Sequence, residues 1–428
     1  MKDHRVISFI DSLCERIYDG RTDIESENLF NTAYGWASGS DDTELTKLGL
    51  VLTGLFDIQY TEKYRNAVLN LGKYDEYTLY SAAAVSGWKD GQALIFDFAK
   101  KTHGWGKIHA VKRFNPNTKN EKAWILKYGC SSGVANSYLA LVCAQKGDMI
   151  NVLRQETMDA YLFSGISIII DALFDEEAAA GISAYEHAEE AVMLYLSHAE
   201  KLCSSSAALN TIITIKGHYE ENACDEMQEI VTRCSNILER SEWDNLIISE
   251  IENEMENGDS SKFFSSWNAA VKLGIDIDEI LFNYVQKYPL ESGFFISPLL
   301  KNPEYRHRVI EFYEKTLPLE KIAAGMGSEL GLGREYEAHR CLAAVLQIIQ
   351  SYPGLGIRLI QAGFSSPVVS SRYGACKVLE TWESSLDQSI NEFAPETAAQ
   401  IKELLSAETD EVLLSRYKKL LKIQDGNT

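Results

Sequence analysis

The sequence has few residues that interrupt helices and no motif of a disulfide framework or a zinc site. Only 8 prolines occur in 428 residues, and proline breaks a helix because it lacks an amide hydrogen and clashes with the preceding turn. Ala, Leu, Glu and Lys, which favour helix, dominate long stretches. The eight cysteines are scattered without a Cys-x-x-Cys pair, so we expect reduced thiols.

Positive charge and long apolar runs are also scarce. The formal net charge of −21 argues against a general nucleic-acid binder, which needs cations to displace counterions from phosphates, and against a membrane-surface role. The most apolar patch, Gly165 to Ile170, is too short to span a bilayer. The first twelve residues contain Lys2, Asp3 and Arg5 and no apolar core of a signal peptide, so we expect a cytoplasmic protein.

The spacing of apolar residues is helical nearly throughout. Residues 340–350 and 375–382 each carry one apolar stripe at helical spacing. Short breakers separate such segments, and they are Asn302-Pro303, Tyr352-Pro353-Gly354 and Ser365-Ser366-Pro367. The chain therefore reads as a series of helices joined by short turns.

Two of these segments look like copies of one unit. Arg340-Cys-Leu-Ala343 and Arg372-Tyr-Gly-Ala375 share an Arg-x-x-Ala pattern 32 residues apart, and Arg308 lies a further 32 residues upstream. A small residue one turn from a long one lets helices approach closely, and regular repetition stacks hairpins into a solenoid. We predict an all-α fold of stacked helical hairpins, a HEAT-like α-solenoid, with an irregular helical bundle as the alternative.

The acidic stretch 249–261 ends in Gly-Asp-Ser-Ser and is the best candidate for a boundary. We predict N-terminal helical repeats over 1–150, a central acidic helical region over 151–260 and C-terminal HEAT-like repeats over 261–428. Residues 220–259 hold thirteen acids against two arginines. Such a run is a solvated helix face or the counterpart of a basic surface elsewhere in the chain.

Residues 100–127, the basic island, reverse the sign of the chain. The basic island contains one acid, Glu121, and eight cations, which are Lys100, Lys101, Lys107, Lys112, Arg113, Lys119, Lys122 and Lys127. Positive charge interleaved with histidine and tryptophan predicts a site for an anionic ligand or an acidic protein. The candidate binding residues are Lys100, Lys101, His103, Trp105, Lys107, His109, Lys112 and Arg113. The alternative is a turn between repeat helices, with Trp105 packed inside and the lysines solvated.

Motifs for cofactors or metals are weak in this sequence. Gly327-Ser-Glu-Leu-Gly331-Leu-Gly333 and Tyr373-Gly-Ala-Cys-Lys377 match the spacings of short-chain dehydrogenases. However, a phosphate-binding glycine loop must follow a buried strand, and residues 319–324 read as helix. Single Glu-x-x-His and His-x-Glu matches do not complete a di-iron site or a facial triad. The residues themselves therefore predict no metal, cofactor or catalytic group.

Three segments carry a resemblance to a known family. Asp97 to Val111, Trp124 to Cys130 and Tyr138 to Gly147 resemble a bacterial family named limonene hydroxylase. The resemblance implies hydroxylation of limonene to perillyl alcohol and carveol, and oxidation of these alcohols with NAD(P). It also implies an oxygen-activating cofactor, because side chains alone do not activate dioxygen. The resemblance carries no catalytic residues over to this chain.

The alternative to the enzyme is a non-catalytic HEAT-like scaffold. Such a scaffold would bind an acidic protein or an anionic ligand through the basic island, and neither hypothesis involves nucleic acid or a membrane. A deep apolar cavity would favour the enzyme, whereas a charged surface would favour the scaffold.

Overall fold

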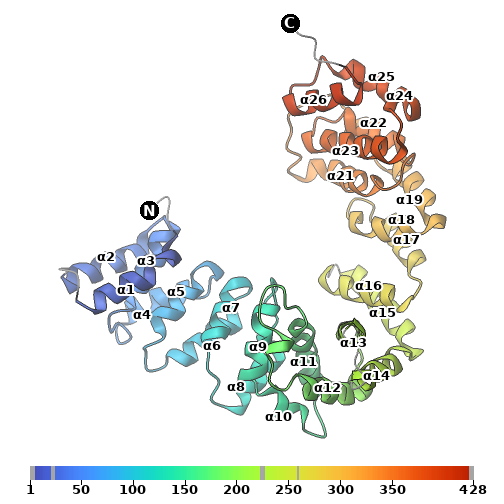
Figure 1. Cartoon of the computed structure of the whole chain (residues 1–428). Coiled ribbons are helices and arrows are strands. Elements are labelled where there is room, and N and C mark those ends of the chain that lie inside the picture. Colours follow the sequence, from blue (N-terminus) through green and yellow to red (C-terminus); the bar gives the residue numbers. More distant parts are fainter. Residues whose placement is uncertain (1–4, 21–24, 222–226, 258–259, 424–428) are drawn as a thin grey trace. The chain divides into compact units, whose positions relative to one another are not determined.

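The fold is all-α. The computed structural model describes residues 5–20, 25–221, 227–257 and 260–423, and these contain 26 α-helices and no strand (Figure 1). The chain divides into two compact units, Met1–Gly274 and Ile275–Thr428, which we describe one at a time. Within the described residues, no helix combines the length and apolarity needed to cross a membrane.

The first unit contains sixteen of the α-helices, coloured blue to yellow-green in Figure 1. They are α1 (Ile10–Tyr18), α2 (Ser26–Gly39), α3 (Thr43–Thr53), α4 (Glu62–Leu71), α5 (Asp75–Val85), α6 (Gly91–Lys101), α7 (Gly104–Arg113), α8 (Lys119–Trp124), α9 (Ser137–Lys146), α10 (Met149–Leu153), α11 (Ala160–Leu173), α12 (Ala188–Leu202), α13 (Ser206–Glu221), α14 (Gln228–Leu238), α15 (Glu242–Asn257) and α16 (Ser260–Leu273). Two short 3₁₀ helices, η1 (Val6–Ser8) and η3 (Ile182–Ala184), and a π-helical turn, η2 (Ile125–Gly129), complete the described elements.

The second unit contains the remaining ten α-helices. They are α17 (Asp278–Lys287), α18 (Ile296–Lys301), α19 (Pro303–Thr316), α20 (Leu319–Ile322), α21 (Glu337–Ile349), α22 (Ile357–Phe364), α23 (Val369–Leu386), α24 (Ile390–Phe393), α25 (Pro395–Leu404) and α26 (Glu411–Leu420). The 3₁₀ helices η5 (Gly293–Phe295) and η6 (Arg334–Tyr336) lie before α18 and α21.

Helices in each unit stack in rows. In the first unit, α3, α5, α7, α9, α11, α13 and α16 form one row in which each helix contacts the next, while α12 links α10 to α14 in a second row. In the second unit, α18, α21, α23 and α26 form one row, and α20, α22 and α25 form another. Two rows of helices that contact mainly their neighbours make an α-solenoid. The predicted solenoid-like fold is confirmed.

Small residues allow the closest helix contacts. A Cβ placed on Gly49 of α3 would collide with the backbone of Ala33 and Ala37 on α2, so these two helices touch backbone to backbone. In α22, a Cβ on Gly363 would approach the Cβ of Ala375 on α23 to 3.1 Å. The small residue at position 375, predicted from the repeat pattern, therefore lies at a close helix crossing.

The repeated arginines share one structural role. Arg340 donates to the carbonyls of Gly331 and Gly333, and Arg372 donates to those of Ser366 and Pro367. Each arginine thus ties its helix to the turn that precedes it. Upstream, Arg306 has this role, since it donates to the carbonyls of Leu300 and Lys301.

Arg308, the upstream arginine of the sequence pattern, has different contacts. Its guanidinium lies 4.5 Å from the ring centroid of Phe282 and 4.7 Å from that of Tyr305, and Nη2 lies 3.7 Å from a carboxylate oxygen of Glu279. The spacing of 32 residues therefore marks the correct helix but not the arginine that holds the turn.

The predicted boundary at 249–261 falls on α15, the turn after it and the first residues of α16. Gly258 and Asp259 lie outside the described residues, and α15 packs against α16. The two compact units meet in sequence at Gly274 and Ile275. The division into three regions stays a prediction.

Candidate functional site

The basic island covers the end of α6, all of α7 and α8, and the start of η2. Helix α7 begins at Gly104, whose φ of +53° is strained for any residue with a Cβ. Asp75 of α5 accepts a hydrogen bond from the Gly106 amide, and a Cβ on either glycine would collide with the Asp75 carboxylate. The Gly-Trp-Gly motif therefore makes a tight turn in which an aspartate satisfies the start of α7.

Half of the cations in the basic island have acidic partners. Lys100 and Lys101 lie 3.9 and 2.7 Å from the carboxylate of Asp97. Lys122 pairs with Asp148 at 3.3 Å, and Lys127 pairs with Asp159 at 3.0 Å. These acids lie outside residues 100–127, so the positive run in the sequence is partly neutralised in the fold.

Lys107 is not on the surface. Its side chain is buried, and Nζ donates to the Ser131 carbonyl at 2.8 Å and lies 5.8 Å from the ring centroid of Trp124. Burial lowers the pKa of Lys107, while the neighbouring thiols of Cys143 and Cys130 oppose this shift. Lys107 holds the turn after η2 against α7, and it is out of reach of a partner protein.

Four other residues of the basic island share one face of α7. We call Trp105, His109, Lys112 and Arg113 the α7 stripe, because the spacings of four, seven and eight residues place them on one side of a helix. Trp105 is 47% exposed, Lys112 and Arg113 are exposed, and His109 is half-buried. Among the residues that the structure describes, neither Lys112 nor Arg113 has an ion-pair partner.

Aromatic contacts hold the α7 stripe in place. The ring centroid of Trp105 lies 5.2 Å from that of Tyr138 on α9, in an edge-to-face arrangement, and 6.4 Å from that of His109. Lys112 Nζ lies 5.3 Å from the Tyr138 centroid. Lys146 donates to the carbonyls of Lys112 and Phe114 and so caps the end of α7. The stripe is an ordered surface.

The charge state of His109 follows from its position. Burial lowers the pKa of His109, and the positive charges of Arg113 and Lys112 lower it further, whereas Asp75 acts in the opposite direction. His109 is therefore neutral near pH 7. Its protonation would place a third cation on the α7 stripe.

A cavity of about 500 Å³ adjoins the α7 stripe. It is formed by η1, α3, α5 and α7, and its lining includes Trp105, His109 and Tyr80. The acids in its wall already have partners, because Glu44 accepts from the Val6 amide and from Lys47, while Glu76 pairs with Lys47. The open positions at the cavity mouth are therefore the aromatic rings.

The remaining predicted site residues lie apart from the α7 stripe. His103 is exposed one residue before α7, and the paired Lys100 and Lys101 end α6. Lys119, which belongs to the basic island, is the exposed first residue of α8. The fold thus brings together four of the eight predicted site residues.

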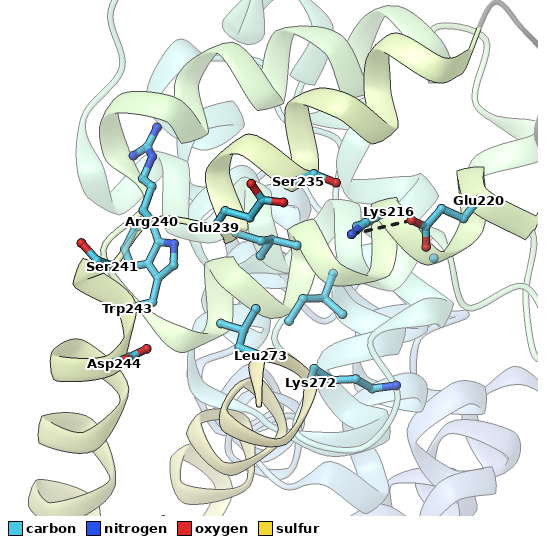
Figure 2. Close-up of a pocket in the computed structure, with 13 residues that line it drawn as sticks. Lys216, Glu220, Ser235, Glu239, Arg240, Ser241, Trp243, Asp244, Lys272 and Leu273 are labelled. Carbon is cyan, nitrogen blue, oxygen red and sulfur yellow. Dashed lines mark ion pairs between the residues drawn. The ribbon is translucent and has the colours of Figure 1, made fainter. Parts of the chain in front are cut away.

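A larger cavity of about 650 Å³ lies between α13, α14, α15 and α16 (Figure 2). Its charged lining residues are Lys216, Arg240, Lys272, Glu220, Glu239 and Asp244. Figure 2 shows Lys216 directed towards Glu220, with Nζ 3.6 Å from the carboxylate. Three cations face three acids, so this cavity has no net charge that would select a ligand.

Sequence reasoning missed both cavities. Their residues come from helices that are distant in sequence, and each residue alone resembles an ordinary surface position. Only Trp105 and His109, between the two glycines and the end of α7, gave an indication of the smaller cavity.

The dehydrogenase-like motifs do not fit a dinucleotide. The glycine segment 327–333 follows α20, which is a helix, and Tyr373 donates its hydroxyl to Asp410 at 3.1 Å. Across the described ranges, no group of three or more His, Cys, Asp or Glu residues could hold a metal ion. The residues that the structure describes therefore do not fit the nicotinamide or the metal cofactors that the family resemblance implies.

Comparison with known proteins adds no identity. No protein-family model, curated protein or solved structure matches the chain. The resemblance to limonene hydroxylases stays a prediction from the sequence.

Proposed function

We propose that this protein is a helical-repeat scaffold that binds an acidic protein segment through the α7 stripe. The observation that supports the proposal most is that Lys112 and Arg113 lack acidic partners among the described residues and lie beside the half-exposed ring of Trp105. Arginine and tryptophan are the residues that contribute most often to binding energy at protein interfaces. The stripe combines both with fixed geometry.

Charge supports an acidic partner. The protein as a whole carries −21, so most of its surface repels an acidic segment, and a locally positive stripe would orient that segment during encounter. The cavity beside Trp105 and His109 offers room for one side chain of the partner. Because the acids of this cavity are already paired, an uncharged aromatic side chain suits it best.

A peptide of repeated Glu-Glu-Phe units, carrying a fluorophore, tests the proposal by anisotropy. Replacing Lys112 and Arg113 by Glu should weaken binding at least about tenfold, because two close attractions become repulsions. Lys100→Glu with Lys101→Glu is the matched control, since it changes the charge equally in an adjacent segment. We expect that control to alter Kd less than about twofold. Equal losses in both double variants would contradict a specific role of the stripe.

Terpene oxidation, which the family resemblance implies, is the second candidate. It is favoured by an apolar cavity of about 330 Å³ between α1, α2 and α3, which is lined by Leu13, Ile17, Leu29, Trp36, Leu48 and Leu52. This volume lies at the lower end of small-molecule sites. Limonene bound there should quench the fluorescence of Trp36, and Trp36→Phe should remove that change.

Turnover separates the two candidates. Purified protein that converts limonene with dioxygen and NAD(P)H, in proportion to its concentration, would support the enzyme. Absence of product, together with tight peptide binding, would leave the scaffold.

A further inference from the structure

A loop of the second unit presents two leucines to solvent. Residues 328–333, the leucine loop, connect α20 to η6, and Leu330 and Leu332 are 77% and 72% exposed. No other leucine in the described part of the chain is more than 40% exposed. Leucines at such exposure leave apolar area in water that a contact would remove.

The backbone of the leucine loop is held firmly. The Glu329 amide donates to the Pro367 carbonyl, and the Val369 amide donates to the Glu329 carbonyl, each at 3.1 Å. Arg340 donates to the carbonyls of Gly331 and Gly333 at 3.2 and 2.6 Å. A loop fixed by four such bonds loses little conformational entropy on binding. The two leucines therefore form a preorganised knob.

An apolar cavity lies beside this knob on the same unit. It has a volume of about 510 Å³, and its lining includes Leu290, Gly293, Ala344 and Ile348. Arg340 also lines the cavity while it holds the leucine loop. The knob and the cavity are consequently neighbours, joined by one side chain.

The charges beside knob and cavity are opposite. Arg334 follows the leucine loop directly and is exposed, and Glu291 is an exposed residue of the cavity lining. Within the described chain, neither Arg334 nor Glu291 has an ion-pair partner. The knob thus carries a free cation and the cavity a free anion.

We propose that the second unit binds a second copy of this chain through this surface. Leu330 and Leu332 of one copy occupy the apolar cavity of the other, and the same contact forms in reverse, because a two-fold dimer uses one self-complementary patch twice. Arg334 of each copy then faces Glu291 of the other. A contact of this size gives a weak, reversible dimer.

Sedimentation velocity of the full chain over a roughly hundredfold dilution series tests the dimer. The wild-type protein should shift from monomer to dimer as its concentration rises. Leu330→Asp with Leu332→Asp should raise the dissociation constant at least about tenfold. Val412→Asp, an exposed apolar position of α26 at 58% exposure, is the control and should leave association unchanged. A wild-type protein that stays monomeric over the whole series would overturn the proposal.

A charge exchange tests the pairing within the dimer. Arg334→Glu alone places two acids together at both contacts, and Glu291→Arg alone places two cations together, so each variant should remain monomeric. An equimolar mixture of the two restores opposite charges at both contacts and should dimerise again. Both residues are exposed, so neither change threatens the fold. A mixture that stays monomeric would also overturn the proposal.

Discussion

The guanidinium of Arg372 and the carboxylate of Glu408 form an ion pair that is closed to solvent. Nε lies 2.8 Å from Oε2, and the two side chains are 1% and 0% exposed. The carboxylate also accepts from the amides of Thr409 and Asp410 and from the Tyr417 hydroxyl. Since Arg372 also donates to the turn before α23, one buried network joins α23 to the segment that leads into α26.

Removing one partner of this network should be costly. Arg372→Met leaves the Glu408 carboxylate buried beside amide donors but without its cation, and we expect a loss of about 3–5 kcal/mol in the free energy of unfolding. Urea titration of the second unit's transition measures it. Arg416→Met, which breaks a partly exposed pair with Glu380, should lose only about 1 kcal/mol. Equal losses would contradict a special role for the buried pair.

The contact between α2 and α3 should depend on Gly49. Gly49→Ala forces a methyl group against the α2 backbone, so the helices must separate, and we expect a loss of about 1–3 kcal/mol. Gly35→Ala is the matched control, because Gly35 lies inside α2 with open space around it. That change should stabilise the protein by about 0.5–1 kcal/mol. Urea midpoints of both variants, followed by circular dichroism, decide the prediction.

Binding of an acidic peptide should strengthen as the pH falls. Burial and the nearby Arg113 and Lys112 lower the pKa of free His109, whereas Asp75 opposes them, so the ring is neutral near pH 7. Carboxylates of a bound peptide would raise that pKa, and binding then takes up a proton. Affinity should therefore rise as the pH drops from about 7.5 through the ordinary histidine range near about 6.5.

His109→Gln separates this effect from other titrations. The variant should bind the Glu-Glu-Phe peptide with little change over the same pH interval, whereas His103→Gln should keep the wild-type dependence. A His109→Gln profile that matches the wild type would show that another group takes up the proton.

Buried Lys107 should make stability depend on pH at the alkaline end. Its pKa in the folded protein is lowered, chiefly by burial, so the lysine costs stability below its unfolded pKa of about 10.4, and the cost shrinks as the pH approaches that value. Lys107→Met removes the titration and keeps the packing. At pH 7 the variant should be as stable as the wild type or up to about 1 kcal/mol more stable. Urea titrations at pH 7 and pH 10 should show its advantage decreasing.

The sequence predicted the helical class and the turns because both depend on local preferences. Asn302 begins α19 by accepting from the Glu304 amide, as an asparagine before a proline suggests. The breakers at 352–354 and 365–367 fall between helices. Repetition of arginine indicated the unit that stacks, although spacing alone selected Arg308 in place of Arg306.

The surface of the basic island could not be predicted in the same way. Asp148 and Asp159, which neutralise Lys122 and Lys127, lie 26 and 32 residues beyond them and meet them only in the folded chain. The burial of Lys107 likewise depends on the turn after η2. Charge in a sequence window therefore overestimates charge on a surface.

The rows of helices also determine how this protein answers to force. Each helix in the row from α3 to α16 contacts chiefly the next one along, so a pull on the chain loads neighbouring contacts and no distant ones. Under tension such a unit would extend in small steps, one hairpin after another, and would recoil when released. The row acts as a spring whose length grows with every helix pair added.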